Sequence, residues 1–251
     1  MKKIQLLAFT LPFIFLSGCA ELNSLLQSSS PKTPLSESEV ADGLKEALIN
    51  GSNEASSILS ATDGYYGDVL VKIFLPQEAK IITDNLSKIP GGEKLVNDLI
   101  LRINRAAEDA AKDAAPIFIN SIKQMTISDA FGILNGEDNS ATLYLISTSR
   151  QDLYNLYLPK IRQSTEKEVM GGISASESWD ALTGKWNLFA SSIAGKLAGF
   201  TPVNTDLEDY LTNRALDGMF LKVEDEEKNI RQNISARTSD LLKKVFSSID
   251  N

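Results

Sequence analysis

Histidine is absent from this chain of 251 residues, and cysteine occurs once, as Cys19. Without histidine, neither Ser-His-Asp nor Cys-His catalysis is possible, and no histidine-ligated metal site can form. A single cysteine excludes an intramolecular disulfide and a metal site built from several thiolates. Any catalysis would therefore depend on carboxylates, lysine, tyrosine or a hard metal ion bound through oxygen atoms.

Basic residues are fewer than acidic ones, 25 against 33, which gives a net charge of −8. A negative surface disfavours binding to nucleic acid and binding to a membrane through a polybasic face. We therefore predict no nucleic-acid partner.

The N-terminus has the three parts of a bacterial lipoprotein signal. Two lysines follow Met1, and residues 4–16 form an apolar segment that is shorter than the roughly 20 residues of a membrane-spanning helix. The sequence Leu16-Ser17-Gly18-Cys19 then places small residues before a cysteine whose thiol can accept a diacylglycerol. We predict that residues 1–18 are a signal peptide and that Cys19 is lipidated. The alternative is an ordinary secretory signal followed by a chance cysteine.

Lipidation would make the bilayer the first partner of the protein. Each buried lipid CH₂ contributes roughly 0.8 kcal/mol, so two or three acyl chains, palmitate among them, anchor a protein stably. Ala20 follows the cysteine where an aspartate would retain a lipoprotein at the inner membrane, and it therefore predicts an outer-membrane anchor that faces the periplasm. Removal of the signal leaves 23 basic and 33 acidic residues, a net charge of −10. Residues 19–35, rich in serine and proline at their end, are predicted to be a tether.

Residues 36–250 are predicted to form one all-α, multi-helix domain, because apolar residues recur at helical spacing behind capping signals. About 215 residues are enough for one sizeable core. Residues 69–75 are β-branched and apolar, and they predict at most one short extended or strand segment. The expected helices cover about residues 36–50, 52–60, 77–88, 93–114, 117–125, 126–135, 139–158, 176–197 and 206–223, with a final one from residue 238 or 239.

Particular residues are expected to break helices or to mark buried and solvated helix faces. Asn50-Gly51 is expected to end the first helix, and Pro159 to break the helix that begins at about residue 139. The apolar stripe of the helix over 176–197 is interpreted as core packing; its members are Trp179, Leu182, Trp186, Phe189, Ile193 and Leu197. Residues 224–227, which are all acidic, are interpreted as a solvated helix end.

Several segments together resemble a bacterial lipoprotein family catalogued as domain of unknown function 4197. These segments are residues 43–48, Met125-Thr126 with Asp129-Ala130, residues 133–136, 215–220, 230–233 and 236–246. Asp138 and Thr142 also fit the family's pattern after the glycine of the central loop, whereas Ser235 stands where a proline is expected. The likeness spans about residues 35–246 and implies an all-helical domain with no assigned activity.

Polar residues on or near apolar helix faces form the candidate polar cluster. Asn104 lies on an apolar stripe and Glu108 follows one turn later, so both need partners, because an unpaired buried polar group costs roughly 1–3 kcal/mol. The cluster consists of Asn104, Glu108, Asp129, Asp138, Thr142, Asp217, Arg231 and Arg237. We expect Arg231 or Arg237 to pair with Asp129, Asp138 or Glu108. The cluster is interpreted either as a ligand pocket or as a structural network that fixes helix register.

The acidic loop over residues 135–139 offers four oxygen-bearing side chains, and calcium takes 6–8 oxygen ligands. Its spacing does not match a calcium loop, and helix capping explains the same residues. We predict neither a metal nor a cofactor. The sequence favours a non-enzymatic, lipid-anchored envelope protein that binds another envelope component. The alternatives are a carboxylate-dependent enzyme or small-molecule binder with a pocket at the polar cluster, and a lipid carrier between helices.

Overall fold

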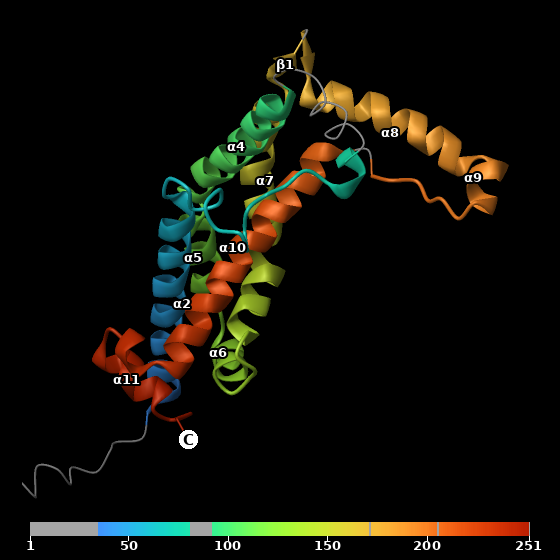
Figure 1. The fold of residues 1–251 in the computed structure, drawn as a ribbon. Coiled ribbons are helices and arrows are strands. Elements are labelled where there is room, and N and C mark those ends of the chain that lie inside the picture. Colours follow the sequence, from blue (N-terminus) through green and yellow to red (C-terminus); the bar gives the residue numbers. More distant parts are fainter. Residues whose placement is uncertain (1–34, 81–91, 171, 205, 251) are drawn as a thin grey trace, which may run out of the picture. The chain divides into compact units, whose positions relative to one another are not determined.

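A computed structural model of the protein describes residues 35–80, 92–170, 172–204 and 206–250 (Figure 1). The described residues confirm the predicted all-α fold. The signal peptide, the lipidated cysteine and the predicted tether lie outside them, apart from Leu35. Of the helix expected over 77–88, only the 3₁₀ turn η1 (Gln77–Ala79) and residue 80 are described.

Long helices of the unit Ser36–Asn251 pack side by side in a bundle (Figure 1). Helix α10 (Leu207–Gln232) packs against both α2 (Glu37–Ser60) and α7 (Ser140–Thr165). Helices α4 (Gly92–Ala111) and α5 (Ala115–Lys123) cover α7 and α2. The core between them includes fully buried aromatic side chains, among them Tyr65, Phe118, Tyr157 and Phe246.

Helix α2 begins where the sequence predicts and extends beyond the predicted end. Ser36 and Glu39 form the expected capping box, in which each side chain accepts a hydrogen bond from the other residue's backbone N–H. The break expected at Asn50-Gly51 is wrong, because the helix is continuous to Ser60. Gly51 is buried against Glu226 and Ile230 of α10, so packing compensates for its low helix propensity.

Helix α7 also continues through a residue that was expected to break it. Pro159 lies inside the helix, and Tyr157 and Ile161 on either side of it are fully buried. Burial of these two side chains contributes several kcal/mol, about 1.5–3 for each one. That gain offsets the local cost of the proline, which is about 3 kcal/mol.

The segment between α2 and η1 is irregular, and no strand occurs at residues 69–75. The short strand pair lies elsewhere, in an antiparallel hairpin of β1 (Glu168–Met170) and β2 (Ile173–Ser174) that the sequence analysis did not anticipate. Gly172 at its turn has φ +78°, a conformation that favours glycine. The apolar run at 69–75 is held by side chains of α4 instead of by a strand partner.

The helix expected over 176–197 is two helices, α8 (Ala175–Ser191) and α9 (Ile193–Leu197). The interpretation of its apolar stripe as core is wrong beyond the first turns. Trp179 is 4% exposed, whereas Ile193 is 80% and Leu197 85% exposed. Packing against the bundle ends partway along α8, and helical periodicity alone does not record where a partner helix ends.

The remaining helices agree with the expected capping signals. Thr126 and Asp129 form a capping box on α6 (Ile127–Leu134), and Asp206 caps α10. After the short 3₁₀ helix η2 (Ile234–Ala236), Ser239 caps α11 (Asp240–Phe246), which packs on α2. Among the described residues, no helix combines the length and the apolar character that crossing a membrane requires.

Candidate functional site

Glu227 and Arg231 form a buried ion pair one turn apart on α10. Their side chains are 4% and 5% exposed, and the Nη2 and Nε atoms of Arg231 lie 3.0 and 3.1 Å from Oε1 of Glu227. Burying two charges is tolerable only when further hydrogen bonds satisfy their remaining donors and acceptors. The partners of this pair therefore decide what it does.

Glu227 caps the first turn of α7 from a neighbouring helix. Its carboxylate accepts hydrogen bonds from the backbone N–H of Ala141 at 2.9 Å and of Thr142 at 2.8 Å, and from the Thr142 hydroxyl at 2.8 Å. Asn139, at the N-cap of α7, makes no side-chain capping bond. The unpaired N–H groups and the positive end of the helix dipole at α7 are thus satisfied by a carboxylate of α10.

Arg231 caps the C-terminal end of α6. Its guanidinium donates to the backbone carbonyls of Ile133 at 2.7 Å and of Leu134 at 3.2 Å, in the last turn of that helix. Carbonyls of a last turn lack helical partners, and a cation is favoured there. The ion pair therefore joins the end of α6 to the start of α7, and anchors both on α10.

Arg237 closes the C-terminal end of α10. It donates to the carbonyls of Ile230 at 3.0 Å and Arg231 at 2.7 Å, and to both carboxylate oxygens of Asp250 at 2.6 and 2.7 Å. The Arg237 guanidinium holds the pKa of Asp250 below its usual range, chiefly through these hydrogen bonds. The guanidinium also lies over the Phe246 ring at 5.5 Å, so it links α10 to α11.

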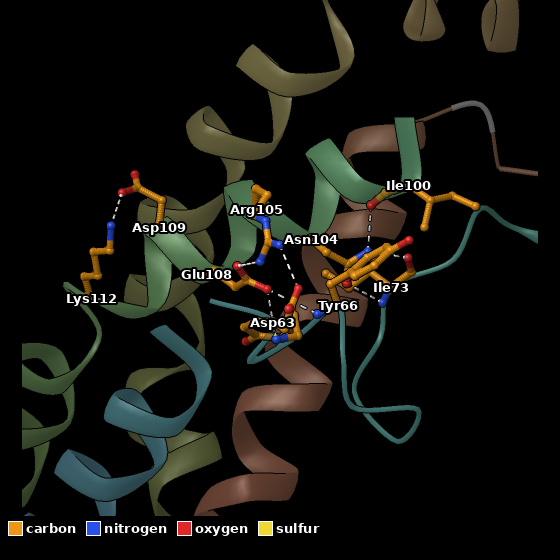
Figure 2. Close-up of polar contacts among 10 residues, drawn as sticks. Asp63, Tyr66, Ile73, Ile100, Asn104, Arg105, Glu108, Asp109 and Lys112 are labelled. Carbon is orange, nitrogen blue, oxygen red and sulfur yellow. Dashed lines mark hydrogen bonds and ion pairs between the residues drawn. The ribbon is translucent and has the colours of Figure 1, made fainter. Parts of the chain in front are cut away.

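A second buried network lies on α4 and holds the irregular segment 61–76 (Figure 2). Glu108 accepts hydrogen bonds from the backbone N–H groups of Tyr65 and Tyr66, each at 3.2 Å, and from Arg105 at 2.5 Å. Asn104 brackets Ile73, accepting from its N–H and donating to its carbonyl, both at 2.9 Å. These contacts replace the strand pairing that residues 69–75 lack.

Tyr65 continues this network into the core. Its hydroxyl donates to the carbonyl of Ala215 at 2.9 Å and lies 3.5 Å from the hydroxyl of Tyr157. Burial raises the pKa of Tyr65 well above its usual value, and the neighbouring Tyr157 adds to that shift. Burial also raises the pKa of Tyr157, so both hydroxyls are neutral hydrogen-bonding groups across the physiological pH range.

The three aspartates of the predicted cluster lie apart from these networks. Asp129 belongs to the α6 capping box, and the backbone N–H of Thr126 lowers its pKa. Asp138 accepts from Gln232 at 2.9 Å. Asp217 pairs at the surface with Arg150 at 3.0 Å and with Arg214 at 3.4 Å. The eight predicted residues therefore divide into several structural groups and do not converge on one site.

The expected pairing of Arg231 or Arg237 with Asp129, Asp138 or Glu108 is wrong. Arg231 does reach the central segment, but through backbone carbonyls, and its carboxylate partner is Glu227 on its own helix. Glu227 was not among the predicted site residues, because residues 224–227 are all acidic and were interpreted as a solvated helix end. The spacing nevertheless indicates that Glu227 is buried. It follows Val223 by four residues and precedes Ile230 by three, which places it on the apolar face of the helix.

A small cavity adjoins the Glu227–Arg231 pair, between α2, α7, α10 and α11. Its volume is about 20 Å³, and its lining is mainly apolar, with Leu44, Val223 and Phe246 among the residues. The volume corresponds to a single water molecule. Across the described ranges, no three potential metal-ligating side chains are grouped closely enough to hold an ion.

A family model described as "Protein of unknown function (DUF4197)" matches residues 34–247. No similar protein was found among the curated proteins, and no similar structure among the solved ones.

Proposed function

Because the chain belongs to the DUF4197 family, which carries no assigned activity, we propose its function from its own residues: it is a lipid-anchored periplasmic module that binds another envelope component. In this proposal Cys19 holds the protein at the outer membrane. The helical domain presents a rigid surface and does not perform chemistry. The bilayer and an envelope partner are its ligands.

The observation that carries the proposal is that the buried carboxylates are fully engaged in hydrogen bonds within the protein. Glu227 and Glu108 accept hydrogen bonds on both oxygens, and their donors are backbone N–H groups, a hydroxyl and arginine side chains. A general acid or base needs a lone pair or a proton that is directed at substrate. Carboxylates saturated in this way support a structural role.

The alternatives from the sequence receive less support. A carboxylate-dependent enzyme or small-molecule binder was tied to the candidate polar cluster, which is divided among several helix contacts. A lipid carrier needs a cavity between helices, and the cavity at the Glu227–Arg231 pair has the volume of one water molecule. A larger hollow of about 330 Å³ is lined by Leu95, Asp98, Leu101 and Arg102, which all belong to the single helix α4.

Replacement of the cysteine tests the anchor. Wild-type protein expressed with an alkynyl palmitate should carry the label and fractionate with outer membranes, and Cys19→Ser should lose both properties. Ala20→Asp is the matched control, since it should keep the label and move the protein to the inner membrane. Unchanged labelling of Cys19→Ser would refute the anchor.

The binding role needs a separate experiment. Native protein would be crosslinked in intact envelopes and its partners identified by mass spectrometry, with the Cys19→Ser protein as the control for location. An envelope component recovered with the anchored protein and lost with Cys19→Ser supports the proposal. Recovery of the protein alone would contradict the binding role without affecting the anchor.

A further inference from the structure

Apolar side chains are concentrated at the surface where α8 meets α9. Residues 185–200, here called the α8–α9 tip, carry large apolar groups that the bundle does not cover. The most exposed are Leu197 at 85%, Ile193 at 80% and Leu188 at 79%, and Phe189 and Phe200 are about half exposed. Side chains of this size gain free energy when they leave water, so their exposure together suggests a surface that becomes covered.

The α8–α9 tip has a defined structure of its own. Figure 1 shows α9 folded back at the end of α8. Trp186, Phe189 and Phe200 form a ring cluster with centroids 5.3–6.2 Å apart. A Cβ on Gly195 would lie 2.3 Å from the Phe189 carbonyl, so only glycine permits this close turn.

Hydrogen bonds tie the returning chain to α8. The Trp186 indole donates to the carbonyl of Thr201 at 3.1 Å, and the Asn187 amide donates to and accepts from the backbone of Val203 at 3.0 and 2.8 Å. The exposed side chains are therefore displayed by a fixed scaffold.

The charge of this region is opposite to that of the chain. Residues 181–205 form the longest stretch without an acidic residue, although the chain has 33 acids among 251 residues. The same stretch contains Lys185 and Lys196, both exposed. A cationic, apolar tip on an anionic protein is repelled less than the remaining surface by a negatively charged partner.

We propose that the α8–α9 tip inserts into the interface of an anionic phospholipid bilayer, with Leu188, Ile193 and Leu197 among the acyl chains. This inference goes beyond the proposed function and does not require acylation of Cys19. Tryptophan and phenylalanine are suited to the headgroup boundary, and lysine can extend its ammonium group to the phosphates while its methylenes remain apolar.

Charge complementarity favours a bilayer over a second copy of the chain. In a tip-to-tip dimer, the two lysines of one tip would meet the two lysines of the other. An anionic leaflet instead attracts both lysines. The tip would thus give the protein a second attachment that fixes its orientation at the membrane.

Spin labels at matched positions test the insertion. Leu197→Cys on the tip and Val69→Cys away from it replace residues that are 85% and 82% exposed. The full, acylated chain would be labelled with a nitroxide and reconstituted in vesicles of phosphatidylethanolamine and phosphatidylglycerol. We expect the Leu197 label to lie about 5–10 Å into the interface, reached by oxygen and protected from a water-soluble nickel complex. The Val69 label should stay accessible to nickel.

Three further variants separate the apolar and the electrostatic contributions. In the Leu197→Cys protein, Ile193→Glu should return the label to water. Lys185→Gln and Lys196→Gln should each lower the ratio of inserted to free tip about fivefold in anionic vesicles. Circular dichroism of each variant verifies that the helical fold is intact.

Several outcomes would overturn the inference. One is a Leu197 label as accessible to nickel as the Val69 label, and another is equal burial of both labels. Spin–spin broadening that grows with protein concentration before lipid is added would assign the tip to a second copy. Failure of the anchor is recognised separately, because an unacylated Cys19 would itself take the nitroxide in the otherwise wild-type chain.

Discussion

The two ends of the buried ion pair on α10 each perform a task that capping residues usually perform within one helix. Glu227 supplies acceptors to the first turn of α7, and Arg231 supplies donors to the last turn of α6. Isolated N–H and carbonyl groups at those turns would be costly once buried. The burial of these two charged residues is therefore explained by the backbone groups to which they hydrogen-bond.

Removal of Arg231 is expected to destabilise the protein strongly. Arg231→Ala leaves the Glu227 carboxylate buried without its cation and removes a donor from the carbonyls of Ile133 and Leu134, of which Ile133 keeps the Gly136 N–H at 3.2 Å. Breaking a buried pair in this way costs roughly 3–5 kcal/mol. Urea denaturation followed by far-UV circular dichroism measures the loss of unfolding free energy.

Arg214→Ala is the matched control for this prediction. Arg214 lies on the same helix and pairs with Asp217, but the two side chains are 55% and 48% exposed. An exposed pair contributes at most about 1 kcal/mol. Equal losses for the two arginine variants would contradict the structural role assigned to Arg231.

The buried arginines could be predicted from the sequence better than their partners. Arg231 and Arg237 were selected because they border apolar helix faces, and both are buried. Half of their hydrogen bonds go to backbone carbonyls, which every residue carries and which no side-chain pattern indicates. Pairing across helices depends on how the helices are turned toward one another, and a single sequence does not specify that arrangement.

At the scale of the elements, Gly43 sets how closely α11 approaches α2. A Cβ built on Gly43 would lie 2.6 Å from Cγ2 of Val245, a fully buried side chain of α11. We expect Gly43→Ala to destabilise the protein by about 1–3 kcal/mol, since overpacking outweighs the better helix propensity of alanine. Thermal or urea melts measure the difference.

A second substitution makes this prediction specific to the contact. In a Val245→Ala background the closest atom, Cγ2, is absent, whereas Leu241 Cγ at 3.2 Å and the Cβ of residue 245 at 3.3 Å remain, so the loss caused by Gly43→Ala should become clearly smaller. Gly132→Ala in α6 is the control, because a Cβ there meets nothing within 4 Å, and it should gain up to about 1 kcal/mol. The same loss in both backgrounds would show that the α2–α11 contact is not responsible.

The segment 61–76 depends on α4 for its order. Asn104→Ala should release the backbone of Ile73, because it deletes both hydrogen bonds to that residue. Losing such buried bonds costs about 1–3 kcal/mol, and the effect should be local. We expect faster amide hydrogen exchange over residues 69–76, read by mass spectrometry.

Asn155→Ala provides the comparison for hydrogen exchange. Asn155 is exposed on α7 and accepts from Gln151 at 3.1 Å, so its loss should leave residues 69–76 unchanged. If the amides of residues 69–76 exchange at the wild-type rate in Asn104→Ala, the two hydrogen bonds between Asn104 and Ile73 do not order the segment.

Local signals predicted the beginnings of helices better than their continuity. The capping boxes at Ser36 and Thr126 form as expected, because capping uses residues three apart in the sequence. Gly51 and Pro159 were expected to interrupt helices, and neither does. Tertiary packing outweighs local propensity at both positions, and the burial that decides the outcome comes from distant segments.

At the scale of the whole molecule, exposed acidic residues stabilise the fold one by one while repelling each other collectively. Glu39, Asp129 and Asp250 all have lowered pKa values, caused respectively by the N–H of Ser36, the N–H of Thr126 and the Arg237 side chain. Asp68 and Asp109 are lowered by hydrogen bonds from Lys222 and Lys160. Each of these groups binds protons less readily in the folded state than in the unfolded chain.

Acid should therefore unfold the protein through these carboxylates. Because their folded pKa values lie below the unfolded values of about 4, the stabilisation is complete above that pH and is lost as pH falls through the folded values. The net charge of −8 acts in the opposite direction, since its self-repulsion weakens as acids become protonated. That repulsion is spread over the surface and screened by salt, so the specific hydrogen bonds should dominate below about pH 4.

We expect urea midpoints to be level from neutral pH to about pH 5 and to fall steadily below about pH 4. Asp129→Asn should start from a lower midpoint and decline less steeply with acid, because one of the titrating caps is gone. A midpoint that rises on acidification below pH 4 would instead mean that charge repulsion, and not the capped and paired carboxylates, governs the acid limit of this fold.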